Sequence, residues 1–327
     1  MLKRNCGTVA LLAAACLAAG FGDLSPALAG LGQPIDGQLG LQLSASPIMD
    51  EITSLFKLIN IVITIIVIFV LILMLWVMYR FSEKNNPTPS RTTHNTLLEV
   101  AWTIVPILIL VGISIPSFHL LFNQYKFPKP DLTIKATANA WFWEHEFLDQ
   151  KVTITSNMVN DEDILRAKIG DESYDKKYGA LDGAALHNAL YQDSLPLWTA
   201  NKQLRRLTVD QEVAVPVNSV VHVLVTSNDV IHSWTIPSFG AKMQAVPGRT
   251  SALWFKATKI GSYHGQCSVL CGKLHSAMPI VFRVVEQKVY DAWMAALKSK
   301  DKKKAQQILN DDTASQVELQ SVAQTQQ

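Results

Sequence analysis

The sequence predicts a membrane-anchored all-β protein, in which a hairpin of two transmembrane helices precedes a β-sandwich or small barrel. Two apolar runs, at residues 58–79 and 100–122, are each long enough to cross a bilayer as a helix. Further along, short β-branched and aromatic runs alternate with Pro, Gly, Asn and Asp, as strands alternate with turns. Hydrophobic residues make up 49% of the chain and charged residues only 17%, which also favours membrane segments. The net charge of +2 gives no indication of nucleic-acid binding.

The first 29 residues have the composition of a secretory signal peptide. The basic start MLKR is followed by a short apolar run at residues 9–19 and by an A-x-A cleavage pattern that ends at Ala29. The apolar run is too short to span a membrane. A lipoprotein signal with an acylated Cys16 is the alternative, although the preceding alanines fit it poorly. Cleavage after Ala29 leaves Cys267 and Cys271 as the only cysteines of the mature chain.

The charges around the two apolar runs define the membrane topology. We assign residues 55–81 and 97–122 to transmembrane helices, residues 30–54 to a periplasmic segment before them and residues 82–96 to the connecting loop. Arg80, Lys84 and Arg91 lie in or beside this loop, so the positive-inside rule places it in the cytoplasm. Both ends of the mature chain then face the periplasm, and the chain is a multi-pass, lipid-embedded protein of a bacterial inner membrane.

Residues 129–292 form the predicted periplasmic β-domain, with strand-like runs at 132–138, 213–217, 220–226, 252–257 and 280–285. A polar and partly helical insertion at about residues 157–206 interrupts this pattern and carries no recognisable functional motif. Residues 293–327 form a charged and Gln-rich tail. We expect its lysines at 298, 300 and 302–304 to be a solvated face and its Gln-rich end to be disordered.

The most informative segment is GQCSVLCGKLHSAMPI at residues 265–280, which contains four soft or borderline metal ligands. Cys267 and Cys271 are four residues apart, His275 follows after four more and Met278 after another three. His232 lies upstream in DVIHSW, at the end of a β-branched run. The spacing predicts a metal site that joins this loop to a distant histidine.

The residue types and their spacing are compatible with three explanations. Two periplasmic cysteines could form a disulfide, which would need neither the histidine nor the methionine. Zinc could take two cysteines and two histidines as a tetrahedral set, but it has no use for Met278. Copper uses all five side chains, because thiolate, thioether and imidazole suit its softness. Two thiolates can also bridge a pair of copper ions that share one electron, which favours electron transfer over substrate chemistry.

The segments DVIHSW, AVPGR and GQCSVLCGKLHSAMPI, placed after a two-helix hairpin, resemble subunit II of the bacterial cytochrome c oxidases of the haem–copper superfamily. The resemblance covers residues 36–292 outside the insertion, and it implies a cupredoxin-like β-domain with a binuclear copper centre, CuA. It implies six copper ligands: Cys267 and Cys271 as bridging thiolates, His232 and His275 as terminal imidazoles, Met278 as a weak thioether and Val269 through its backbone carbonyl.

The resemblance implies the electron-accepting subunit of an oxidase complex. Such a subunit takes electrons from cytochrome c and passes them to haem in subunit I, where oxygen is reduced to water and protons are pumped. The expected partners are subunit I, other oxidase subunits, cytochrome c and membrane lipid, with no nucleic acid, and the chain is an enzyme only within the complex. Two rivals are a copper chaperone for oxidase assembly, which would have one span, and a nitrous oxide reductase, which would need a large propeller domain.

Three further residues are assigned from the same resemblance. Trp141 in WFW matches a family tryptophan where electrons enter from the donor; an anchor in the core or at the membrane interface is the alternative. Glu99 opens the second helix on the cytoplasmic side and matches the mouth of a proton pathway, although the helix dipole alone favours an acid there. Val269 stands where the family usually has Glu. It lacks the carboxylate that reaches a magnesium or manganese ion, so we expect that interfacial site to be missing or rebuilt.

Overall fold

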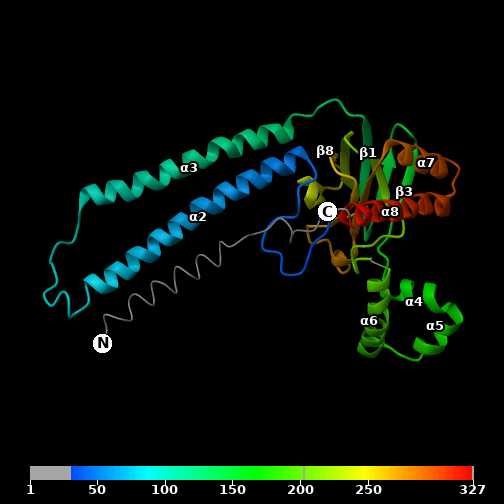
Figure 1. Ribbon diagram of the computed structural model, residues 1–327, viewed down its shortest axis with the longest axis horizontal. Coiled ribbons are helices and arrows are strands. Elements are labelled where there is room, and N and C mark those ends of the chain that lie inside the picture. Colours follow the sequence, from blue (N-terminus) through cyan, green and yellow to red (C-terminus); the bar gives the residue numbers. More distant parts are fainter. Residues whose placement is uncertain (1–30, 202, 326–327) are drawn as a thin grey trace.

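The computed structural model describes residues 31–201 and 203–325, with side chains described up to residue 313. The predicted signal peptide at residues 1–29, together with Cys16, lies outside the described residues. The predicted fold class is confirmed, because two long apolar helices precede a domain built on β-sheets (Figure 1).

The two apolar helices, α2 (Pro47–Arg80) and α3 (Thr96–Tyr125), lie side by side and extend away from the β-domain (Figure 1). Most of their apolar side chains are exposed, which suits a lipid environment rather than water. Ser46 begins α2 by accepting a hydrogen bond from the Met49 backbone N–H at 3.0 Å, and Pro47 occupies the first helical turn. Both helices continue beyond their predicted apolar spans at the end that meets the β-domain, where α2 begins at Pro47 and α3 ends at Tyr125.

Short polar contacts fix the helix hairpin to the β-domain. The Ser46 hydroxyl donates to the Phe239 carbonyl at 2.8 Å, and the Ala45 N–H donates to the Ser238 carbonyl at 2.9 Å. At the end of α3, the Trp254 indole N–H donates to the Gln124 carbonyl at 3.1 Å. Each helix therefore has its own attachment, and the domain is held at a defined place relative to the membrane.

The β-domain contains three sheets. Five strands pair in the order β3 (Val152–Ser156), β2 (Phe142–Phe147), β1 (Leu132–Asn139), β5 (Val220–Ser227) and β8 (Ser251–Lys256). A second sheet has the order β4 (Val213–Pro216), β10 (Pro279–Val285) and β9 (Gly261–Gln266), and β6 (His232–Ile236) pairs with β7 (Ala241–Ala245). The pairs β1–β5 and β4–β10 are parallel, and the other pairs are antiparallel.

The core is formed by inward-facing residues of all three sheets. Buried and half-buried residues alternate strictly along β5, as expected of a strand with one face on a core. Aromatic rings fill the centre: Phe239, in the short helix η2 (Pro237–Phe239), stacks on Phe255 with ring centroids 4.6 Å apart, and Trp234 meets Phe282 edge-on at 5.4 Å. Burial of each such ring contributes about 1.5–3 kcal/mol, so the core holds the ends of β6 and β10 in place.

The segment predicted as a partly helical insertion contains three helices, α4 (Asp161–Ile169), α5 (Asp171–Tyr178) and α6 (Gly183–Ala200). They stand apart from the sheets (Figure 1) and have their own small core, which is made by Ile164, Leu165, Tyr174, Tyr178 and Trp198. Two hydrogen bonds from Asn157 to the Asp210 carboxylate, at 2.8 and 3.1 Å, close the base of the insertion. The insertion is thus a separately packed unit whose two ends meet at a single β-bridge between Met158 and Val209.

The C-terminal tail contains two helices, α7 (Gln287–Lys298) and α8 (Lys302–Thr325). The sequence of this tail predicts a solvated lysine face and a disordered Gln-rich end. The sequence 302–325 lacks Gly and Pro and contains five Gln, three Ala and three Lys, which are good helix formers. The first turns of α8 also bury Ala305 and Leu309 in the main core. Local propensity and this burial together explain the helix.

Candidate metal centre

The four ligand-type residues of the loop gather because two strands pair at its ends. β9 and β10 are antiparallel neighbours, with Gln266 opposite Pro279. The loop between them therefore leaves and returns at one place, and the Cys267 N–H donates to the Met278 carbonyl at 3.0 Å. The loop carries the short helix η3 (His275–Ala277), which begins at the histidine.

The donor atoms of four predicted ligands lie close together. The two sulfur atoms of Cys267 and Cys271 are 3.7 Å apart. Each sulfur has its own imidazole nitrogen nearby, with Cys267 Sγ 3.9 Å from His232 Nδ1 and Cys271 Sγ 3.5 Å from His275 Nδ1. The donor atoms of His232, Cys267 and Cys271 all lie within 4.8 Å of one another, so these three residues form a group that can hold a metal ion.

The remaining two predicted ligands border the same group. The Val269 carbonyl oxygen is 3.3 Å from Cys267 Sγ. Met278 is buried, 1% exposed, and its backbone carbonyl accepts the Cys267 N–H. The structure therefore brings all six residues predicted from the loop and from DVIHSW to one end of the β-domain.

The electrostatics of the two thiols suit a cation. Both cysteines are free and buried. Burial raises the pKa of the Cys271 thiol to about 12, with a further contribution from the neighbouring Cys267. Two adjacent thiolates are unstable in a buried place unless positive charge lies between them, and a bound metal ion supplies that charge. Two soft sulfurs with imidazole nitrogens beside them fit copper, which favours these donors.

Asp229 is a part of the site that the sequence reasoning missed. His232 Nε2 donates a hydrogen bond to Asp229 Oδ1 at 2.7 Å, which leaves His232 Nδ1 free on the side of Cys267. Burial by itself raises the pKa of the Asp229 carboxyl, but hydrogen bonds from His232 and from the Val230 N–H outweigh it and hold the pKa below its usual value. The available signal was the Asp at the start of DVIHSW, three residues before the histidine.

The structure places the other two predicted functional residues very differently. Trp141 is half-buried in the turn between β1 and β2, and its indole N–H donates to the Cys271 carbonyl at 3.2 Å. The Trp141 ring also lies against the backbone of Gly272. Glu99 is exposed in the first turn of α3, at the end far from the β-domain (Figure 1). A helix of 30 residues is about 45 Å long, so Glu99 is no part of the metal site.

A β-domain that is anchored by a transmembrane hairpin and carries a buried Cys–Cys–His group defines a membrane-bound protein with a soft-metal site. Comparison with known proteins identifies the family within this class. Family models for cytochrome c oxidase subunit II match twice, with the transmembrane domain over residues 34–120 and the periplasmic domain over residues 188–285.

Curated relatives match along most of the chain. Cytochrome c oxidase subunit 2 of Cereibacter sphaeroides is 41% identical over 288 residues, which is 88% of each chain. A probable cytochrome c oxidase subunit 2 of Rickettsia bellii is 36% identical over 265 residues, covering 81% of this chain and 86% of the relative. The crystal structure of the periplasmic domain of subunit II (CoxB) of Bradyrhizobium japonicum is 39% identical, with a TM-score of 0.40 over 54% of this chain and 99% of that one.

The chain belongs to the cytochrome c oxidase subunit II family. The resemblance predicted from the copper loop is thereby confirmed, and the C-terminal β-domain is the periplasmic domain of that family. The rival assignments, a copper chaperone and a nitrous oxide reductase, do not fit a chain that matches subunit II relatives over 88% of both lengths. The transmembrane family model matches the part of the chain that holds the two apolar helices, which agrees with the predicted localisation in a membrane.

Proposed function

We propose that this chain is the electron-accepting subunit of a cytochrome c oxidase. It takes electrons one at a time from cytochrome c and delivers them to haem in subunit I, where oxygen is reduced to water and protons are pumped. The observation that carries the proposal is the pair of free, buried sulfurs 3.7 Å apart, each with its own imidazole nitrogen within 3.9 Å. Membership of the subunit II family supports the same role.

We propose that these sulfur and nitrogen donors, with two weaker ones, are the ligands of a binuclear copper centre. Cys267 and Cys271 would supply the thiolates that hold such a centre, His232 and His275 its imidazoles, and the Met278 thioether and the Val269 carbonyl two weaker donors. Copper held by these residues would supply one-electron redox chemistry. Zinc would leave Met278 without a role.

The surrounding residues prepare the site for electron transfer. Burial of both cysteines keeps water away from the sulfurs, and Asp229 fixes the His232 ring through the 2.7 Å hydrogen bond. Trp141 is the proposed point where electrons enter, because its half-exposed ring reaches from the surface to the Cys271 carbonyl. Glu99 is the proposed mouth of a proton pathway at the opposite end of α3.

The experiment that tests the copper assignment is a metal and EPR analysis of the full-length chain, purified in detergent and loaded with copper. We expect two copper ions per chain and one unpaired electron shared over both nuclei. A Cys267→Ser variant should lose this signal. One copper per chain, stable zinc, or a Cys267–Cys271 disulfide in the protein as purified would overturn the proposal and leave only the family assignment.

Val269 leads to a second proposal about metal content. Its carbonyl oxygen is 3.3 Å from Cys267 Sγ and is available to copper, but its side chain cannot bind magnesium or manganese. We therefore propose that the interfacial site at subunit I is missing or rebuilt. In the purified complex, magnesium and manganese should be substoichiometric, and Val269→Glu should raise their content while the copper EPR signal persists. One tightly bound magnesium or manganese ion beside Val269 in the unmodified complex would refute this.

A further inference from the structure

Six exposed lysines form a basic patch where the turn between α7 and α8 meets the turn between β2 and β3; they are Lys151, Lys298, Lys300, Lys302, Lys303 and Lys304. Four of them, at 151, 298, 300 and 302, line a surface cavity of about 380 Å³. Gln150 and Thr153 add polar groups to its wall. The cavity is within the size range of small-molecule sites, roughly 300–1,000 Å³.

Two acids, Asp149 and Asp301, lie in the same turns, but neither forms an ion pair with a lysine of the basic patch in the described part of the chain. None of the six lysines forms an ion pair there, whereas Lys177 in the insertion pairs with Asp193 at 2.8 Å. Lys298 contacts only the neutral amide oxygen of Gln150. The acid within the turn, Asp301, accepts a hydrogen bond from the Lys304 backbone N–H, so it caps α8 without neutralising a lysine side chain.

Three of these lysines also stand where helix electrostatics disfavours them. Lys302, Lys303 and Lys304 occupy the first turn of α8, a 24-residue helix. The positive end of the helix dipole lies there, and cations at that end are destabilising by a few tenths of a kcal/mol each. The capping carboxylate of Asp301 offsets only part of this cost, because it stands against three lysine charges.

We propose that the basic patch binds a small polyanion that carries several phosphate groups. Lysine ammonium groups are common phosphate ligands, and four of them surround one cavity. The patch lies at the end of the β-domain away from α2 and α3 (Figure 1), so a soluble ligand reaches it and lipid headgroups do not.

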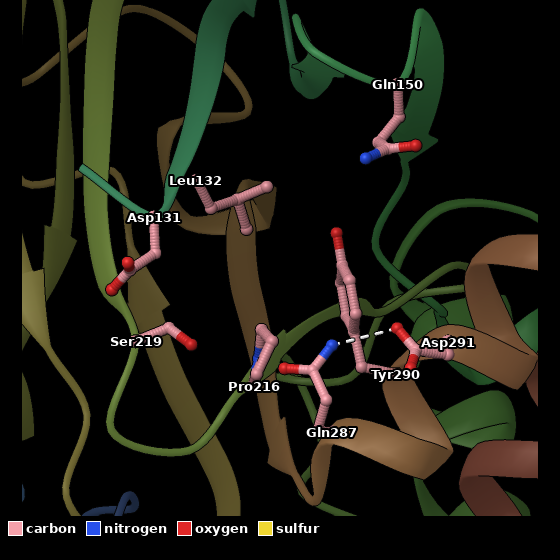
Figure 2. Close-up of a pocket in the computed structure, with 8 residues that line it drawn as sticks. All are labelled: Asp131, Leu132, Gln150, Pro216, Ser219, Gln287, Tyr290 and Asp291. Atoms are coloured by element: carbon pink, nitrogen blue, oxygen red, sulfur yellow. Dashed lines mark hydrogen bonds between the residues drawn. The ribbon is translucent and has the colours of Figure 1, made fainter.

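A neighbouring cavity is lined by acidic residues, so it disfavours an anion that the lysines of the basic patch would bind. Figure 2 shows that cavity, which has a volume of about 220 Å³ and shares Gln150 with the basic one. Asp131 and Asp291 border it, and no lysine or arginine lines it. An anion is repelled there, so the basic cavity is the place on this side of the domain that the polyanion occupies.

The test is calorimetric titration of inorganic triphosphate into the full-length chain in a neutral detergent at low salt. The test variant is Lys298→Gln/Lys302→Gln, which keeps Lys151 and Lys300 because their backbones are left-handed, with φ of 53° and 62°. The matched control, Lys168→Gln/Lys176→Gln, removes the same charge from exposed positions on α4 and α5. The copper EPR signal of each variant checks that the fold is retained.

We expect one triphosphate per chain, with binding that weakens about tenfold or more in the test variant, since the loss of each phosphate contact removes a salt-dependent share of the affinity. The control should stay within about twofold of the unmodified chain. Equal weakening in both variants would show only diffuse attraction by net charge and would overturn the proposal. The proposal would also be overturned if the chain bound poly-glutamate but not triphosphate. That result would indicate an acidic protein as the partner of the basic patch.

Discussion

Asp229 controls the metal site from outside the ligand set. It accepts the Nε2 hydrogen of His232 and so decides that Nδ1 faces the sulfur of Cys267. Loss of such an outer partner costs about 10–100-fold in metal affinity. We predict a copper affinity lower by this factor in Asp229→Ala and a smaller loss in Asp229→Asn, which keeps an acceptor. Competition with a copper chelator measures both; equal affinity in Asp229→Ala and the unmodified chain would contradict the prediction.

His145 links the stability of the domain to pH. Its ring is fully buried and accepts a hydrogen bond from the Trp234 indole at 3.2 Å, and burial lowers its pKa to about 3. Between about pH 6.5 and pH 3 the unfolded chain binds a proton here that the folded chain does not, so the free energy of unfolding falls by up to about 1.4 kcal/mol per pH unit as pH drops through this window.

We therefore predict that His145→Phe flattens this part of the pH dependence, whatever it does to stability at neutral pH. Urea unfolding of the metal-free chain between pH 4 and pH 7, followed by tryptophan fluorescence, measures the slope. The same substitution at the exposed His187 is the control. An unchanged slope in His145→Phe would show that other groups carry the acid sensitivity.

At the scale of residues, sequence reasoning identified side chains whose chemistry is unusual in combination. Two cysteines, a histidine and a methionine in one short loop indicate a metal without knowledge of the fold. Asp229 has only the weak signal of its place three residues before His232, and His145 has none, because the hydrogen bonds that make them important are formed only in the folded chain.

At the scale of elements, the insertion depends on one carboxylate. Asp161 in α4 accepts hydrogen bonds from Ser194 and Trp198 in α6, both at 2.9 Å, and from Arg205 beyond it, at 2.6 Å. Although burial opposes it, these bonds lower the pKa of Asp161, so the carboxylate is charged at neutral pH. Removing it leaves several donors unsatisfied, at a cost of about 1–3 kcal/mol.

We predict that Asp161→Ala loosens α4 and α6 and leaves the metal site intact. Hydrogen exchange should accelerate across residues 161–200 and stay slow in β5, while the copper EPR signal is unchanged. Glu172→Ala, an exposed position on α5, is the control and should exchange like the unmodified chain. Faster exchange in β5 as well would mean that the insertion and the sheets unfold together.

The sequence predicted several of the elements whose own residues favour a strand. The β-branched runs at 213–217, 220–226 and 280–285 correspond to β4, β5 and β10. It gave no strand for β7 (AKMQA) or β9 (GSYHGQ), because these are polar or Gly-containing and become strands only by pairing with β6 and β10. In the tail, the polar composition gives no indication of the burial of Leu309 against the domain, which supports the start of α8.

At the scale of the whole molecule, the helix hairpin separates the two residues for which we propose electron and proton uptake. Trp141 lies beside the copper loop in the β-domain, and Glu99 lies at the far end of α3 (Figure 1). About 45 Å of helix lies between the ends of α3, so a change at either residue reaches the other only through the assembled complex. If Trp141 takes up electrons and Glu99 takes up protons, substitutions at the two residues should affect different stages of the reaction.

In the assembled oxidase, Trp141→Ala should slow the first electron transfer from reduced cytochrome c by about tenfold or more, equivalent to about 1.4 kcal/mol of barrier, with copper content unchanged. Glu99→Gln should leave that first transfer unaltered and lower steady-state turnover, because only turnover requires protons from the cytoplasmic side. Stopped-flow absorbance of cytochrome c separates the two stages, and oxygen consumption measures turnover. If Glu99→Gln turned over at the normal rate, the carboxylate would be no more than a favourable charge at the N-terminus of α3. If Trp141→Ala accepted its first electron at the normal rate, the indole would serve only to hold the Cys271 carbonyl in place.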